Sequence, residues 1–111
     1  MSWIAKLKFH HLKTLVALAE QQNLTRVSEL MNITQPALSK WLSGLEEELG
    51  IRQFERHSKG IRPTPGGLLV VKHARRLVND LERSTRDIEL FKEGIQGSLM
   101  IGSSPVATDV V

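Results

Sequence analysis

A proline at the front of an apolar, helically spaced stretch shows where one helix of this chain begins. Thr34 stands before Gln35 and Pro36, and a threonine hydroxyl can accept a hydrogen bond from a backbone N–H of the first turn. Pro36 is tolerated there because the first N–H groups of a helix have no partner within it. The sequence therefore predicts a helix over residues 34–49, ended by Gly50. Its predicted inward side chains are Leu38, Trp41, Leu42, Leu45 and Leu49.

Two shorter helices are predicted before this one. Apolar residues recur at helical spacing over residues 9–22, and again over residues 25–31. Thr25 is the predicted N-cap of the second of these helices, and residues 32–33 form a tight break before the third. The side chains expected to face the core are Phe9, Leu12, Leu15, Val16, Ala19, Val27, Leu30 and Met31. The first fifty residues thus predict a body of three helices.

A small β-hairpin is expected after the third helix. Residues 51–56 and 61–64 are loosely strand-like, and the sequence HSKG between them contains Gly60, which suits a turn. Pro63 restricts the second segment to a short edge strand because proline lacks a backbone donor. We expect these two segments to form a wing beside the helices.

The last predicted element is one long helix over residues 65–95, opened by Pro65. Its apolar residues are separated alternately by four and three positions, which is the spacing of a heptad seam. The seam consists of Val70, Ala74, Leu77, Leu81, Ser84, Ile88, Phe91 and Ile95. Charged residues flank it. A single helix cannot bury such a seam alone, so it predicts a partner, most simply a second copy of the chain.

Composition narrows the class of protein. The net charge is +3, and residues 1–64 carry all of this excess, with nine Lys or Arg against six Asp or Glu. The absence of cysteine excludes disulfides and Cys-ligated zinc. The sequence contains neither an apolar run near the roughly 18 residues of a membrane span nor a signal-peptide pattern. We therefore expect a soluble, cytoplasmic protein without a membrane partner.

The two helices 25–31 and 34–49, with a short turn between them, match the helix-turn-helix pattern, whose second helix enters the DNA major groove. Gln35 can pair with adenine, and Lys40 can reach guanine or a phosphate. Pro36 and Ala37 offer apolar surface to a thymine methyl group. The remaining candidates for contact with the DNA backbone, or for contact from the wing, are Thr25, Arg26, Thr34, Ser39, Arg56, Lys59 and Arg62. Lys59, at the hairpin tip, is best placed to probe the flanking minor groove.

Less specific interpretations remain open at this point. The wing cations can be solvated residues that protect a sheet edge, and Trp41 can serve packing or a dimer contact instead of base stacking. A pure dimerisation or interaction module would explain the heptad seam, but not the polar, basic front of helix 34–49. Catalysis is disfavoured because the histidines lack partners at the spacing of a metal or catalytic site, and Gly66-Gly67 lacks the context of a phosphate loop. We expect no enzyme, no metal site and no cofactor in this chain.

The motifs TQPALSK, LEEELG, FER and TPGG, in this order and spacing, resemble the N-terminal region of LysR-type transcriptional regulators. The resemblance covers about residues 7–104. It implies a winged helix-turn-helix over residues 1–64, a linker and dimerisation helix over 65–95, and a hinge with the truncated start of an effector-binding domain at 96–111. The stretch GSLMIG, in which Leu99-Met100-Ile101 resembles a strand, is similar to that domain's first strand.

The resemblance also implies function. Members are bacterial regulators that dimerise through antiparallel linker helices, often assemble as dimers of dimers, bind imperfect palindromes in double-stranded DNA, and respond to small-molecule inducers. Gln35, Pro36, Ser39 and Lys40 fall on the family's DNA-reading positions. Its phosphate-contacting positions match Thr25, Arg26 and Thr34, and Lys59 matches its wing tip.

The chain departs from the family pattern at a few positions. Ser43 and Gly44 stand where basic or long polar residues are common, so fewer backbone contacts are expected there. Gln53 and Pro63 replace typical leucines in the wing. Trp41 stands at a usually polar position. We therefore predict a mainly α protein, with a three-helix core, a two-stranded wing and a long dimerisation helix.

Overall fold

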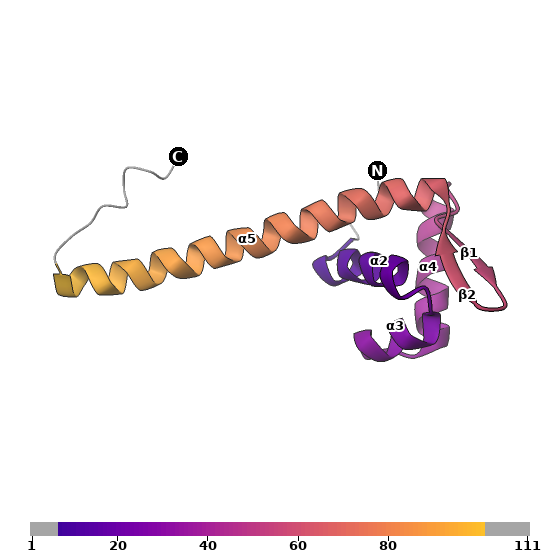
Figure 1. Ribbon diagram of the computed structural model, residues 1–111, viewed down its shortest axis with the longest axis horizontal. Coiled ribbons are helices and arrows are strands. Elements are labelled where there is room, and N and C mark those ends of the chain that lie inside the picture. Colours follow the sequence, from indigo (N-terminus) through magenta and orange to yellow (C-terminus); the bar gives the residue numbers. More distant parts are fainter. Residues whose placement is uncertain (1–6, 102–111) are drawn as a thin grey trace. The chain divides into compact units, whose positions relative to one another are not determined.

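The computed structural model describes residues 7–101, and side chains are described for residues 7–95. Its elements, drawn in Figure 1, are α2 (Phe9–Gln21), α3 (Leu24–Met31), α4 (Gln35–Leu49), β1 (Phe54–His57), β2 (Gly60–Pro63) and α5 (Pro65–Ile101). The chain divides into two compact units, Met1–Val78 and Asn79–Val111. The first unit holds the three short helices, the hairpin and the opening turns of α5. The predicted mainly α fold with a two-stranded wing is confirmed.

Helix α4 begins and ends where the sequence predicts. The Thr34 Oγ1 atom accepts a hydrogen bond from the backbone N–H of Ala37 at 3.2 Å, and Pro36 lies in the first turn. At the other end Gly50 adopts a left-handed conformation with φ of 76°, and its N–H donates to the Glu46 carbonyl at 2.9 Å. Both ends are fixed by local chemistry, so the start of α4 is a rigid, well-defined surface.

The predicted cap of α3 is wrong. Asn23, and not Thr25, is the N-cap, and its Oδ1 atom accepts from the backbone N–H of Arg26 at 2.9 Å. Gln22 ends α2 in a left-handed conformation with φ of 53°, which returns Asn23 to extended backbone ready to start the next helix. Thr25 lies inside the first turn of α3.

The core of the first unit is built around leucines of α2 and α4, to which α3, the hairpin and the start of α5 add further apolar side chains. It contains Leu15, Leu18, Val27, Leu38, Leu42, Leu45, Phe54, Ile61, Val71 and Ala74. Leu30, predicted to face inward, is 57% exposed. The covered positions of α3 are 24, 27, 28 and 31, which share one helical face, and position 30 falls outside that face. Trp41 and Leu49 are only half-buried.

The wing is an antiparallel pair in which Phe54 lies opposite Pro63 and Arg56 lies opposite Ile61. The Ile61 N–H donates to the carbonyl of Gln22 at 3.2 Å, which ties the hairpin to the turn before α3. Gly60 has φ of 141°, and a Cβ atom there would collide with the same carbonyl oxygen. Only glycine fits this close approach.

Residues 51–53 do not join the strand that was predicted to start at residue 51. Backbone groups of residues 52 and 53 instead accept hydrogen bonds from Thr64, whose side chain donates to the Arg52 carbonyl at 2.6 Å and whose N–H donates to the Gln53 carbonyl at 2.9 Å. The Thr64 Oγ1 atom also accepts from the N–H of Gly67 at 3.0 Å, so Thr64 caps α5 as well. A Cβ atom at Gly67 would collide with the Gln53 carbonyl.

Helix α5 continues to Ile101, so the predicted strand at residues 99–101 is wrong. A lone strand leaves its backbone groups without partners, whereas a helix satisfies them within itself. Residues 102–111, the rest of the expected next domain, lie outside the described residues. In the described part of the chain no helix has an apolar stretch that could cross a membrane.

The predicted seam of α5 divides between the two units. In the first unit Ala74 is buried in the core and Val70 packs against that core, so the body of the chain already covers both. Leu77 is 46% exposed. Along the second unit Leu81, Ile88, Phe91 and Ile95 are each more than 40% exposed. Large apolar side chains therefore remain uncovered along α5.

Candidate nucleic-acid interface

The residues predicted to meet DNA all lie at the surface of the first unit. Gln35 and Ser39 are half-buried, and the others, Thr25, Arg26, Thr34, Pro36, Ala37, Lys40, Arg56, Lys59 and Arg62, are exposed. Leu38 and Leu42, on the opposite side of α4, are fully buried. Helix α4 is thus anchored by its apolar face, and its polar face is free to reach a ligand.

A hollow of about 370 Å³ brings four of the predicted residues together, namely Thr25, Gln35, Arg56 and Lys59. We call it the α3–wing hollow. Its other lining residues, which sequence reasoning missed, are Asn23, Leu24, His57, Ser58, Gly60 and Ile61. The lining carries two cations and no carboxylate, which suits an anionic ligand such as a phosphate. In the sequence these missed residues are marked only by being neighbours of Thr25 or of Lys59.

Arg56 connects the wing to α4. Its Nη1 atom donates a hydrogen bond of 2.7 Å to the Oγ atom of Ser39. The two residues are 17 positions apart and belong to different elements, so no local pattern indicates the contact. This bond ties the direction of one predicted DNA-binding side chain to that of another.

The positive charge of the predicted interface is not neutralised by ion pairs among the described side chains. The ion pairs found there join Arg75 to Glu20 at 2.7 Å and Lys92 to Glu89 at 3.4 Å. Neither involves one of the five predicted DNA-binding cations. Arg62 lies opposite Glu55 in the hairpin register, but these two described side chains do not form an ion pair. These cations therefore keep their charge available for a polyanion.

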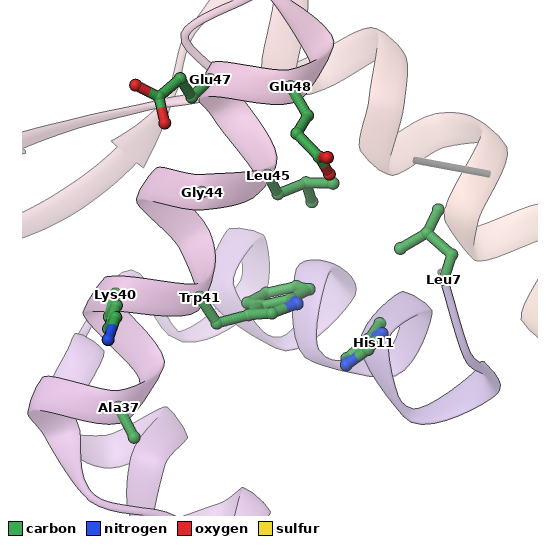
Figure 2. A pocket seen from close by; sticks show the side chains of 9 residues that line it. All are labelled: Leu7, His11, Ala37, Lys40, Trp41, Gly44, Leu45, Glu47 and Glu48. Atoms are coloured by element: carbon green, nitrogen blue, oxygen red, sulfur yellow. The ribbon is translucent and has the colours of Figure 1, made fainter. Parts of the chain in front are cut away.

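Ala37 and Lys40 face a different hollow, on the side of α4 next to α2. This groove of about 570 Å³, shown in Figure 2, is lined by Leu7, His11, Ala37, Lys40, Trp41, Gly44, Leu45, Glu47 and Glu48. The predicted residues near the start of α4 thus line two different hollows. Arg26 and Arg62 line neither hollow.

The Trp41 ring in this groove stacks on the His11 ring of α2, with centroids 4.9 Å apart and planes inclined by 25°. The expectation that Trp41 serves packing thus agrees with its contacts. Burial lowers the pKa of His11 below its ordinary value of 6.5, and the nearby His10 and Lys8 lower it further. The Nδ1 atom of His11 also accepts a hydrogen bond from the backbone N–H of Lys8 at 3.1 Å. That bond requires an unprotonated Nδ1.

Metal chemistry receives no support from the described side chains. Among them no group of three or more histidine, cysteine or acidic residues lies close enough together to hold a metal ion. The arrangement is one of hydrogen-bond donors and cations around a helix start, which is the chemistry of nucleic-acid recognition.

Known proteins share this sequence pattern. The model of a family described as bacterial regulatory helix-turn-helix protein, lysR family, matches residues 9–68. The HTH-type transcriptional regulator GbpR of Azospirillum brasilense is 40% identical over 99 residues, which make up 89% of this chain and 29% of GbpR. BenM of Acinetobacter baylyi is 33% identical over 106 residues, 89% of this chain and 35% of BenM. The chain spans about a third of the length of these curated relatives.

Solved structures agree with the sequence matches. A crystal structure of the BenM DBD in complex with benA site 1 DNA has a TM-score of 0.72 at 32% identity, covering 79% of this chain and 99% of that one. A CbnR DBD–DNA complex has a TM-score of 0.69 at 28% identity, covering 78% and 99%. The relatives are regulators and not enzymes. The chain belongs to the LysR family of bacterial regulatory helix-turn-helix proteins.

Proposed function

We propose that this chain is the DNA-binding and dimerising part of a LysR-type transcription regulator. In this proposal α4 enters the major groove, the wing reaches the adjacent minor groove, and two copies bind a dyad-symmetric operator. The observation that carries it is the exposed start of α4, held on a buried leucine face and surrounded by cations without ion-pair partners among the described side chains.

The major-groove assignment rests on the geometry of α4. A recognition helix needs a rigid attachment and base-reading side chains in its first turns. Leu38, Leu42 and Leu45 supply the attachment, and Thr34 fixes the first turn. Gln35 and Lys40 supply hydrogen-bond groups for base edges or phosphates.

The α3–wing hollow supports the backbone contacts. Thr25 lines it from α3, and Arg56 and Lys59 line it from the hairpin. A phosphate placed there would meet two cations and a threonine hydroxyl. Lys59, in the turn between β1 and β2, is the residue we assign to the flanking minor groove.

Dimerisation is assigned to the uncovered seam of α5. Leu77, Leu81, Ile88 and Phe91 are between 46% and 59% exposed. Burying apolar surface of this kind contributes roughly 25 cal/mol per Å². A second copy with the same heptad spacing is the partner that fits best, and it would give the two half-sites of a palindrome.

For the domain organisation and the oligomeric state of the whole protein, our proposal is taken from the LysR family. We place the DNA-binding domain at residues 1–64, the linker helix at 65–95, and the start of a further domain at 96–111. The whole protein is proposed to bind a small-molecule inducer through that further domain, to act in the cytoplasm, and to assemble as a homodimer or a dimer of dimers.

The test is the salt dependence of binding to random-sequence duplex DNA, measured by fluorescence anisotropy. Each phosphate contact by a cation releases counterions, so log affinity should fall with log salt by a slope of roughly −0.9 for each neutralised phosphate. Lys59→Ala should reduce the slope by about one. Lys72→Ala, which removes an exposed cation outside the proposed interface, is the matched control. An affinity that salt leaves unchanged would instead support a protein-interaction module.

A further inference from the structure

Four hydroxyl groups on the described helices form hydrogen bonds to other groups of the chain, and one of the four differs from the rest. Thr14 donates to the His10 carbonyl at 2.7 Å, Ser28 to the Thr25 carbonyl at 2.7 Å, and Thr85 to the Leu81 carbonyl at 3.0 Å. In each case the hydroxyl proton is used within the same helix. Ser39 differs, because its Oγ atom accepts a hydrogen bond from the Arg56 side chain of the wing.

The chemistry of arginine fixes the direction of this bond. A guanidinium group carries donors and no acceptor, so Ser39 must accept from Arg56. The charge also makes the bond stronger than one between neutral groups. With one lone-pair position of the oxygen occupied, the hydroxyl proton of Ser39 remains available for a third group.

Arg56 is well placed to hold this contact. Its strand neighbour two residues earlier, Phe54, is 1% exposed, and its partner across the hairpin, Ile61, is 2% exposed. The backbone of Arg56 is therefore fixed to the core from both strands, while its side chain is exposed. Ser39 follows the fully buried Leu38 on α4.

We infer that Arg56 is a positioning residue that fixes the Ser39 hydroxyl as a hydrogen-bond donor toward DNA, and that it thereby couples the wing to the recognition helix. This inference rests on the proposed function. Ser39 then donates to a hydrogen-bond acceptor of the DNA, which is either a base edge in the major groove, such as a purine N7 or a thymine O4, or a phosphate oxygen of the adjacent backbone. Without Arg56 the hydroxyl can turn back to the Gln35 carbonyl one helical turn earlier, as the hydroxyls of Thr14, Ser28 and Thr85 do.

The test is a double-mutant cycle on the duplex that the wild-type chain selects from a random pool. Ser39→Ala removes the hydroxyl, and Arg56→Lys keeps the charge but loses the planar guanidinium. Each single variant should bind about three- to tenfold more weakly. Because both changes break the same contact, the double variant should bind within about twofold of the weaker single variant. The salt slope of Arg56→Lys should stay at the wild-type value, since the charge is kept.

A matched control uses Arg62→Lys, on the other strand of the hairpin, where Arg62 pairs with Glu55 in the register. The loss of binding free energy in Arg62→Lys should add to the loss in Ser39→Ala when the two changes are combined. Thermal unfolding of every variant checks that the fold is kept, and Ser39→Thr should restore the coupling because it restores the hydroxyl.

If the fold-losses in affinity of Arg56→Lys and Ser39→Ala multiply in the double variant, the two residues act independently. That result would overturn this inference while leaving the proposed function intact. Wild-type affinity of Arg56→Lys would overturn it equally. A wild-type chain that selects no sequence would overturn the proposed function itself.

Discussion

One carboxylate oxygen of Glu46 on α4 accepts the backbone N–H of Phe54 at 2.9 Å, and the same atom accepts the N–H of Gln53 at 2.8 Å. The start of the wing is therefore attached to α4 by a charged acceptor. Two backbone donors at the edge of the core depend on this one side chain.

Glu46→Ala should lower the free energy of unfolding by about 1–3 kcal/mol, because it leaves these two partly buried N–H groups without an acceptor. Urea unfolding followed by circular dichroism measures the loss. Glu47→Ala, one residue later and exposed, is the matched control and should change stability by less than about 0.5 kcal/mol. Equal effects of the two variants would contradict the role assigned to Glu46.

Gln53 should be a position where a less polar residue stabilises the fold. Its side chain is fully buried, and its Nε2 and Oε1 atoms have no hydrogen-bond partner among the described residues. A buried amide without partners costs about 1–3 kcal/mol. Gln53→Leu should therefore raise the free energy of unfolding by about 1–2 kcal/mol. The same urea experiment measures the gain, and an unchanged or lower stability would show that the amide has a partner.

His11 should make the fold sensitive to acid. Its pKa is lowered in the folded chain by burial, then by His10 and Lys8, so folding favours the neutral ring. The stability it contributes is fully present above the unfolded value of 6.5, and is lost as pH falls from 6.5 toward the lower folded pKa. The other charged side chains that line the same groove as His11 are Lys40, Glu47 and Glu48.

Trp41 offers a direct readout, because its ring stacks on His11. In a Trp3→Phe background, emission from Trp41 should titrate with a midpoint below 6.5, and His11→Gln should abolish the transition. A midpoint at or above 6.5 would contradict the assigned environment, and a transition that survives in His11→Gln would assign it to another group.

Leu81→Arg should convert the proposed dimer to a monomer. Leu81 is 47% exposed in the proposed seam, and an unpaired charge there would have to be buried in the dimer. Sedimentation velocity should show monomers, with much weaker binding to paired half-sites. Leu90→Arg is the control, since Leu90 is 63% exposed but lies outside the heptad positions. Dimers of Leu81→Arg would show that the seam is wrongly assigned.

Local chemistry explains which parts of this structure were predictable. Thr34, Pro36 and Gly50 act within one helical turn of their own position, and the predicted bounds of α4 are confirmed. Asn23 and Thr25 are both good caps, and only the left-handed turn at Gln22 decides between them. Sequence alone does not contain that turn.

Contacts between distant residues could not be predicted. The bond from Arg56 to Ser39 and the bonds from the wing backbone to Glu46 depend on how the hairpin lies against α4. The sequence named Ser39 and Arg56 as candidate DNA contacts but did not indicate that they touch each other, and it assigned no role to Glu46. The expected strand at residues 99–101 failed because the family's first strand needs partners that the described residues do not provide.

The most direct test of the account is selection of binding sites from random duplexes by the wild-type chain and by Gln35→Ala, at one stated salt concentration. The wild type should enrich a palindrome with a fixed half-site spacing. Gln35→Ala should bind the enriched duplex roughly 1–3 kcal/mol more weakly and lose preference at one base pair of each half-site. An unselective wild type, or a uniform loss on all duplexes in the variant, would contradict the claim that the exposed start of α4 reads DNA.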